Sequence, residues 1–326
     1  MMKDYYILNN GRLKRKDNTL YFEDCEGNKK ALPIEQIDTM HVYGEVDLNT
    51  KMINYISQYG IILNFYNYYG YYTGSFYPRK KNVSGFLLVC QSACYLDSNE
   101  RIYLAKSFIK SAVHHILRNM RYYKVDNNLI ELIKKESENL DYVEDIPTLM
   151  GIEGRIRKTY YKSFNQILKN GYSFDKREKR PPKDPINALM SFGNSIMYTN
   201  VLKEMYKTQL DPTISFLHEP SSKRFSLSLD IAEIFKPLII DPIIFSLVNN
   251  RRLTKKDFIY EDEICYLSED GKKKFLSDFE GKMNTTIKHR KLNRQVSYRY
   301  FIRLECYKLI KHFIGDEKYK VLKAWW

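Results

Sequence analysis

The stretch SNERIYLAKSFIKSAVHHILRNM, residues 98–120, decides the fold class of most of the chain. Its apolar residues recur at three- and four-residue steps, which is the pattern of an amphipathic helix that buries one side. Ser98 fits the N-cap position. Similar spacing predicts more helices downstream, one starting at Asp184-Pro185 and one broken near Pro237. The expected helices cover residues 98–120, 128–140, 148–168, 184–206, 225–248, 275–283 and 295–314.

The first 85 or so residues carry a different pattern. Short runs rich in β-forming residues are separated by turn signals such as Asn9-Asn10-Gly11, which is typical of strands. We expect strands over residues 5–8, 19–23, 40–43, 61–66 and 71–77, and one helix over 50–58. The sequence therefore predicts an α+β protein, with a small β-rich domain (1–86), a linker (87–97) and a larger all-α catalytic domain (98–326). The small domain is expected to serve in dimerisation and as a scaffold, or else to pack only on its own chain.

The charge balance favours a polyanionic partner. The chain of 326 residues has 53 Lys and Arg against 39 Asp and Glu, which gives a formal net charge of +14. Nucleic acid is the commonest such partner, and a membrane surface is the rival. We expect no membrane span, because the longest apolar stretch, residues 237–248, is short and cut by Asp241 and Pro242. Five scattered cysteines, an odd number, favour free thiols in the cytoplasm.

Basic residues cluster in segments that are expected to be loops of the helical domain. These clusters are residues 176–180, 251–252, 255–256 and 288–291. A charge run is usually a solvated face, but several runs on one domain of a basic protein also fit a track for phosphate groups. The sequence leaves both interpretations open.

The segment SLSLDIAEIFKP carries the strongest chemical signal. Asp230 and Glu233 are three residues apart, so both carboxylates lie on one face of the expected helix, among apolar neighbours. Two such carboxylates repel each other and are costly to desolvate. We therefore expect a positive partner, which could be a Lys or Arg, a metal ion or a phosphate-bound cation. The alternative is a structural ion pair.

Two further residues could complete a site. Glu153 in LMGIEGRIRKTYY stands between two glycines that leave room for a close approach, although a Glu near a helix start is also favoured by the helix dipole. His218 in FLHEPSS could equally be a structural histidine. Together with Asp230 and Glu233 they form a hard oxygen and nitrogen set that suits Mg²⁺ or Mn²⁺. On a basic chain this set predicts phosphoryl transfer on nucleic acid.

Three segments in this order resemble the Cas one family of CRISPR adaptation proteins. They are LMGIEGRIRKTYY, DPINALMSFGNSIMYTN and LDPTISFLHEPSSKRFSLSLDIAEIFKPLIID. The resemblance implies a homodimer that joins a small partner, Cas two, and inserts captured double-stranded DNA fragments into a CRISPR repeat array. It also implies metal ligation by Glu153, His218 and Glu233, with Asp230 as an additional acid. Many relatives carry Asp where this chain has Glu233.

The mechanism implied by this resemblance is transesterification, in which the 3′-hydroxyl of a fragment attacks a phosphodiester at the edge of a repeat. The divalent ion, Mg²⁺ or Mn²⁺, would act as a Lewis acid. Nuclease activity would be the same chemistry with water. Two other functions stay open from the residues alone: a non-catalytic architectural DNA-binding protein, and an RNA-processing nuclease.

Overall fold

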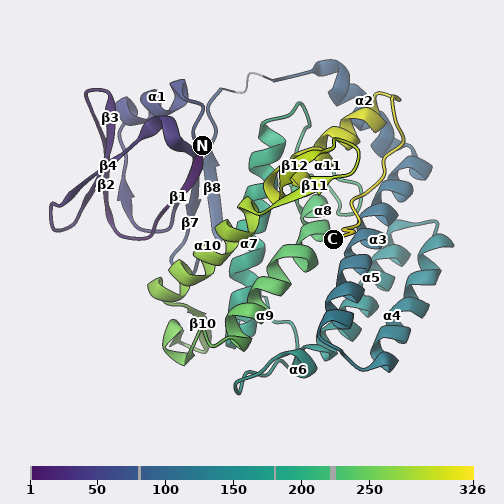
Figure 1. Cartoon of the computed structure of the whole chain (residues 1–326). Coiled ribbons are helices and arrows are strands. Elements are labelled where there is room, and N and C mark those ends of the chain that lie inside the picture. The colour runs from purple at the N-terminus through teal and green to yellow at the C-terminus, as the bar shows by residue number, and fades with distance from the viewer. Residues whose placement is uncertain (1, 80–81, 180, 221–224) are drawn as a thin grey trace. The chain divides into compact units, whose positions relative to one another are not determined.

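The computed structural model describes residues 2–79, 82–179, 181–220 and 225–326 (Figure 1). The chain divides into two compact units, Met1–Val83 and Ser84–Trp326. The first is built mainly from strands and the second mainly from helices. This order confirms the α+β class expected from the change of hydrophobic period.

The N-terminal unit holds two four-stranded sheets within its described residues. Their orders are β1-β5-β7-β8 and β4-β3-β2-β6. The elements are β1 (Lys3–Ile7), β2 (Gly11–Lys16), β3 (Thr19–Asp24), β4 (Lys29–Leu32), β5 (Ile37–Val42), β6 (Val46–Asp47), α1 (Thr50–Gln58), β7 (Ile62–Tyr66) and β8 (Tyr72–Phe76). Helix α1 begins after Asn49, whose side chain accepts a hydrogen bond from the Met52 N–H.

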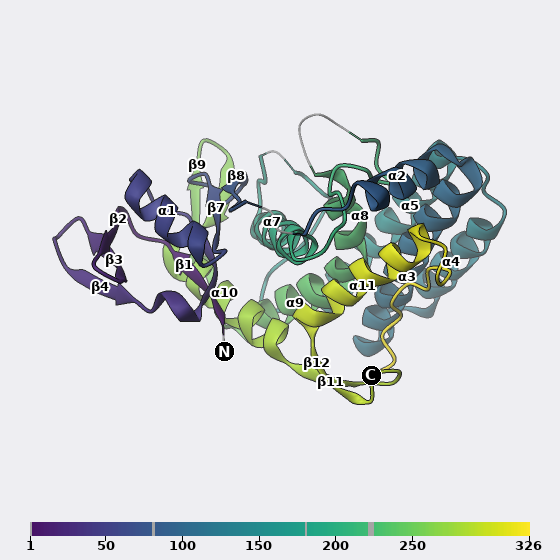
Figure 2. The same ribbon diagram turned by 90° about the horizontal axis from the view of Figure 1, so that it is seen from above.

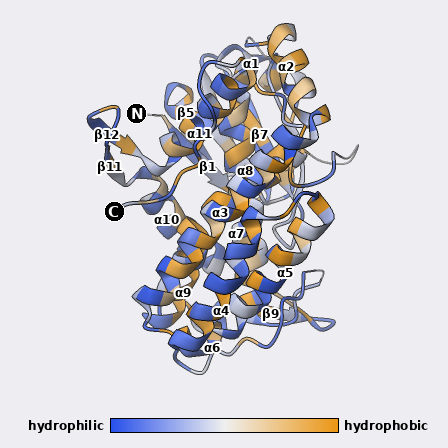
Figure 3. Cartoon of the chain, turned by 90° about the vertical axis from the view of Figure 1, so that its right-hand side faces the viewer, coloured by the Kyte–Doolittle hydropathy of each residue, from blue (hydrophilic) through white to orange (hydrophobic). Residues whose placement is uncertain are grey.

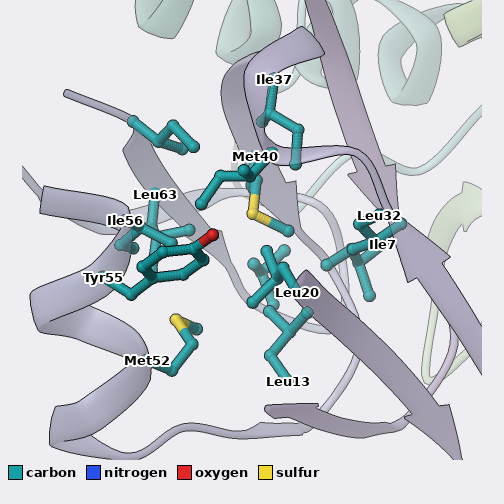
Figure 4. Close-up of a cluster of buried hydrophobic side chains, with 13 residues drawn as sticks. Ile7, Leu13, Leu20, Leu32, Ile37, Met40, Met52, Tyr55, Ile56 and Leu63 are labelled. Carbon is teal, nitrogen blue, oxygen red and sulfur yellow. The ribbon is translucent and has the colours of Figure 1, made fainter. Parts of the chain in front are cut away.

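One apolar core holds this unit together (Figure 4). Met40 on β5, Leu20 on β3 and Met52 on α1 are fully buried in it, so the core joins both sheets and the helix. His41 follows Met40 and therefore points to the opposite face of the sheet. There its Nδ1 and the Tyr66 hydroxyl form a hydrogen bond of 2.8 Å.

The C-terminal unit consists mostly of helices (Figures 1 and 2). Helix α8 packs against α3 on one side and α7 on another, so it lies in the middle of the unit. The helices are α2 (Gly85–Leu96), α3 (Ser98–Tyr122), α4 (Asn127–Glu138), α5 (Ile146–Lys162), α6 (Phe164–Ile167), α7 (Pro185–Tyr206), α8 (Ser226–Phe235), α9 (Asp241–Asn249), α10 (Glu269–Asn284) and α11 (Tyr298–Phe313). No helix in the described ranges is long and apolar enough to span a membrane.

A π-helical segment, Lys236–Ile240, joins α8 to α9. Pro237 has no N–H, so it cannot donate to the carbonyl of Glu233 as an α-helix would require. The backbone instead forms a wider turn, in which the Asp241 N–H donates to the Lys236 carbonyl five residues back. The break expected near Pro237 is thus a local change of helix type. Close packing supports it, since Gly193 of α7 leaves no room for a side chain beside Ile240.

Three details of the sequence prediction were wrong. Residues 87–97, expected as a linker, belong almost entirely to helix α2, which is mainly hydrophobic in Figure 3 and exposes Phe86 and Leu96. The second unit is not all-α, because it contains the hairpins β9 (Phe258–Glu261) with β10 (Ile264–Leu267) and β11 (Thr286–His289) with β12 (Arg294–Ser297). The N-cap of α3 is Asp97 rather than Ser98, since the Asp97 carboxylate accepts the first free N–H groups.

Candidate metal and phosphodiester site

Glu153 lies in the third turn of α5, too far from the helix start for the helix dipole to explain it. Its Oε1 accepts a hydrogen bond of 2.9 Å from Nε of Arg157, one helical turn later. The same guanidinium donates through Nη2 to Oε2 of Glu233 on α8. One arginine therefore joins two carboxylates that come from different helices and are eighty residues apart in the sequence.

Glu233 has a second cationic partner. Lys236 Nζ, one turn along the chain, contacts its Oε1. Burial alone would raise the pKa of Glu233, but Lys236 and Arg157 outweigh it and lower that pKa to about 2. The expectation of a positive partner for this carboxylate is therefore met by two side chains of the protein itself.

His218 and Asp230 form a separate pair. Asp230 is fully buried on α8, and its carboxylate accepts backbone N–H bonds of 2.7–3.0 Å from Phe216, Leu217 and His218. It also accepts a bond of 2.7 Å from Nδ1 of His218. Asp230 thus fixes the turn before α8 and, in the neutral ring, keeps the proton on Nδ1 so that Nε2 has a free lone pair.

A buried polar chain lies behind these residues. Asn119 Nδ2 on α3 donates to the Tyr160 hydroxyl at 3.2 Å, and this hydroxyl donates to Oδ2 of Asp241 at 3.1 Å. Burial raises the pKa of Asp241 to about 6, against the lowering effect of Arg157. The chain links α3, α5 and α9, and Arg157 and Glu233 both influence the pKa of its Asp241.

The four predicted residues are therefore brought together in two pairs. Arg157 joins Glu153 to Glu233, and Asp230 holds His218, which in its protonated form also lowers the pKa of Glu233 through its positive charge. Among the described residues, no three acidic, histidine or cysteine side chains converge as a preformed metal site.

The donor set nevertheless fits a hard divalent ion. The guanidinium is a cation held between two carboxylates, so it marks the place where a metal ion would satisfy the same oxygens. The Nε2 of the neutral His218 ring would add one nitrogen. Glu153, Glu233 and His218 are the side chains that would hold such an ion, whereas the hydrogen bonds of Asp230 already occupy its oxygens.

The sequence analysis missed Arg157, Lys236 and Asp241 as parts of the site. The first two could have been found from spacing, because Glu153 and Arg157 are four residues apart and Glu233 and Lys236 are three apart. Asp241 gave no such signal, because its partner Tyr160 comes from a distant helix.

The basic clusters lie at the surface, as either interpretation requires. Arg177 is an exception within the first of them: its guanidinium donates to Asn187 Oδ1 at 2.8 Å and Ser191 Oγ at 3.0 Å and so supports the start of α7. Arg180 lies outside the described residues. Arg290 stacks over the Trp325 ring, 4.9 Å from its centroid.

Comparison with known proteins gives a consistent result. The family model described as CRISPR associated protein Cas1 matches residues 5–281. The chain is 60% identical to the CRISPR-associated endonuclease Cas1 of Clostridium perfringens, over the full length of both chains. It is 36% identical to a solved CAS1 protein from Thermotoga maritima, with a TM-score of 0.90, covering 98% of this chain and 100% of the other.

Two more distant structures share the fold. A casposase bound to its integration product matches with a TM-score of 0.87 at 20% identity, covering 99% of this chain and 94% of the other. A Cas6-RT-Cas1 protein in complex with Cas2 matches with a TM-score of 0.82 at 16% identity, covering 99% of this chain and 36% of the other.

Proposed function

Because the chain belongs to the Cas1 family of CRISPR-associated proteins, we propose that it is a metal-dependent DNA integrase that inserts DNA fragments into a CRISPR array. Its full-length relatives carry the name endonuclease, so the chemistry is enzymatic and acts on phosphodiesters. Insertion by transesterification is the specific form proposed here. Nuclease activity is the same displacement with water as the nucleophile.

The observation that carries this proposal is the convergence of Glu153 and Glu233 on one guanidinium, with His218 nearby. Two carboxylates and one imidazole are the donors that Mg²⁺ and Mn²⁺ accept. When bound, such an ion polarises a phosphodiester and offsets the charge of the displaced oxygen. Glu153, Glu233 and the Nε2 of His218 are the proposed ligands.

The surrounding side chains have other proposed tasks. Asp230 keeps His218 in the tautomer that can ligate, so it acts through the histidine rather than on the substrate. Arg157 and Lys236 are the two cations at the carboxylates, and both can donate to a phosphate oxygen once Glu233 is otherwise engaged. They would orient the attacked phosphodiester for the 3′-hydroxyl of the incoming fragment.

We propose double-stranded DNA, a second copy of the chain and Cas2 as partners, in the cytoplasm. The net charge of +14 supports the DNA partner. Two insertions at opposite ends of a repeat require two sites, which supports a homodimer, and the N-terminal unit is the proposed dimerisation and scaffold element. The Cas2 complex of a protein with the same fold supports the third partner.

A strand-transfer assay tests the proposal. A labelled duplex with free 3′-hydroxyls and a supercoiled plasmid bearing a repeat are mixed with the protein and Mn²⁺, with and without Cas2. We expect label joined to the plasmid, lost with a chelator and lost in Glu153→Ala although that variant still binds DNA. Glu136→Ala is the matched control, because Glu136 forms only a surface pair with Arg155.

Two outcomes would redirect the proposal. Metal-independent DNA binding with no product in any mixture would indicate an architectural protein. Cleavage of single-stranded RNA much faster than joining of DNA would indicate an RNA-processing nuclease.

A further inference from the structure

The C-terminal segment, residues 319–326, has no regular secondary structure but lies against α3 and α11 (Figure 1). Tyr319 is almost fully buried, and its hydroxyl donates to Glu305 of α11 at 2.7 Å. The carbonyl of Leu322 accepts a bond from Ser111 Oγ of α3. Trp326 donates through Nε1 to the Tyr298 hydroxyl at 2.6 Å. The segment is therefore bound along its length by specific hydrogen bonds.

His115 of α3 connects this segment to the helix of the candidate site. The Ala324 N–H donates to His115 Nε2 at 3.1 Å, so the ring proton is on Nδ1. Nδ1 then donates to the Ile234 carbonyl at 3.0 Å. Ile234 directly follows Glu233, and His115 is only 1% exposed. Burial lowers the pKa of His115 to about 3, so the ring stays neutral in this bridge.

Asn119, one turn further along α3, makes the companion contact. Its Nδ2 donates to the Pro237 carbonyl at 2.6 Å. In a π-helix this carbonyl would accept from residue 242, but Pro242 has no N–H. The side chain of Asn119 thus supplies a donor that the backbone lacks. His115 and Asn119 hold carbonyl groups on both sides of Lys236.

We propose that His115 and Asn119 are positioning residues of the candidate site, and that the C-terminal segment fixes His115 in this role. This inference rests on the proposed function, because it concerns the same metal site. The two side chains hold the carbonyls of Ile234 and Pro237. Lys236 lies between these two residues, and Glu233 directly precedes Ile234. Loss of the bridge allows that stretch to move, and the Glu233 carboxylate no longer meets Glu153 at a fixed separation.

The test measures Mn²⁺ binding to the full chain without DNA, by the decrease in the free Mn²⁺ signal in electron paramagnetic resonance. His115→Leu removes both hydrogen bonds and is expected to weaken Mn²⁺ binding about tenfold, the low end of the effect of residues that orient metal ligands. His115→Gln can both accept and donate, so it should restore most of the affinity. Ser107→Ala is the control on the same helix: the Ser107 hydroxyl donates to the Tyr103 carbonyl of α3 itself at 2.8 Å.

Hydrogen exchange of backbone amides in residues 230–241 gives a readout that does not depend on metal. We expect faster exchange in His115→Leu, and in Ala324→Pro, which deletes the donor to His115 Nε2 and leaves His115 itself unchanged. Ser107→Ala should exchange as the wild type does. Ala324→Pro also serves if His115→Leu does not fold.

The outcomes separate the two proposals. No Mn²⁺ binding by the wild type, with faster exchange in the His115 and Ala324 variants, overturns the metal site and keeps the positioning role. Normal Mn²⁺ affinity and normal exchange in both folded variants overturn the positioning role and leave the metal site standing. An equal loss of affinity in Ser107→Ala would also overturn it, because any change in α3 would then suffice.

Discussion

Replacing Arg157 by Met tests how the two carboxylates are held in the absence of metal. The substitution keeps an unbranched apolar chain in place of the aliphatic part of Arg157 but removes the charge that Glu153 and Glu233 share. Lys236 then remains as the partner of Glu233, and Glu153 loses the ion pair that the structure records for it. We expect a less stable metal-free protein that binds Mn²⁺ more tightly, because no guanidinium has to leave the carboxylates.

The magnitude follows from the pKa of Glu233. Its decrease from 4.5 to about 2 corresponds to roughly 3 kcal/mol of stabilisation at neutral pH. Lys236 contributes more of the lowering than Arg157, so the loss of Arg157 removes only part of this stabilisation. The Glu153 pair adds to it, and removing one partner of a buried ion pair typically costs about 3–5 kcal/mol. Since these side chains keep some contact with solvent, we expect a loss of about 2–3 kcal/mol.

The direction of the Glu233 pKa shift sets how the stability changes with pH. The pKa of Glu233 is lower in the folded than in the unfolded state, so its stabilisation is present above about pH 4.5 and is lost as the pH falls toward 2. The difference between wild type and Arg157→Met is therefore largest at neutral pH and decreases in acid.

Urea unfolding in EDTA and in Mn²⁺, at several pH values, provides the assay. Mn²⁺ should raise the free energy of unfolding more in Arg157→Met than in the wild type. The control is Arg155→Met on the same helix, whose partner Glu136 lies at the surface, so we expect a change of at most about 1 kcal/mol. Equal stabilisation by Mn²⁺ in wild type and Arg157→Met would refute the idea that the guanidinium occupies the position of the ion.

Three further predictions concern stability. Asp230→Ala leaves three buried N–H groups and His218 without an acceptor, and we expect a loss of at least about 3 kcal/mol in urea unfolding; a loss below 1 kcal/mol would contradict its structural role. Gly193→Ala places a Cβ 2.6 Å from Ile240 Cγ2, so calorimetry should show a loss of about 1–3 kcal/mol, whereas an unchanged melting temperature would mean that the π-helical segment yields easily. The pKa of Asp241 is raised to about 6, so its stabilising contribution is complete below pH 3.8 and is lost as the pH rises through 6. Asp241→Asn should therefore stabilise the metal-free protein by on the order of 2 kcal/mol at pH 8 but not at pH 4. A pH-independent effect in urea unfolding would argue against the raised pKa of Asp241.

The elements that the sequence predicts best are those with a repeated apolar spacing. Helix α1 has the predicted bounds, and α3 follows the stripe read from residues 98–120. Strand β2 was missed because its residues, Gly11–Lys16, are mostly basic and only Leu13 is fully buried. The two hairpins of the helical unit were missed because strands of four residues are too short to show a period.

The candidate site was predictable in its residue types but not in its pairing. The three-residue spacing placed Asp230 and Glu233 on one helix, and both are in fact shielded from solvent. Lys236 was within reach of a spacing argument, but the other partners could not be deduced, because the His218 turn and Arg157 reach these carboxylates from elsewhere in the fold, 12 and 76 residues away in the sequence. Which carboxylate meets which cation depends on how α5 packs near α8, and a local pattern carries no information on that.

The balance of charge among Glu153, Glu233, Arg157 and Lys236 has a thermodynamic consequence. Two negative groups are offset by two positive ones, so a divalent ion that enters this quartet leaves an excess of two positive charges. Each DNA phosphate bound there offsets one of these charges, and the ion and the DNA must then strengthen each other's binding by the same factor. The protein without DNA would bind the metal ion weakly, and its site would be fully occupied only on DNA. This coupling would limit cleavage of other phosphodiesters in the cell.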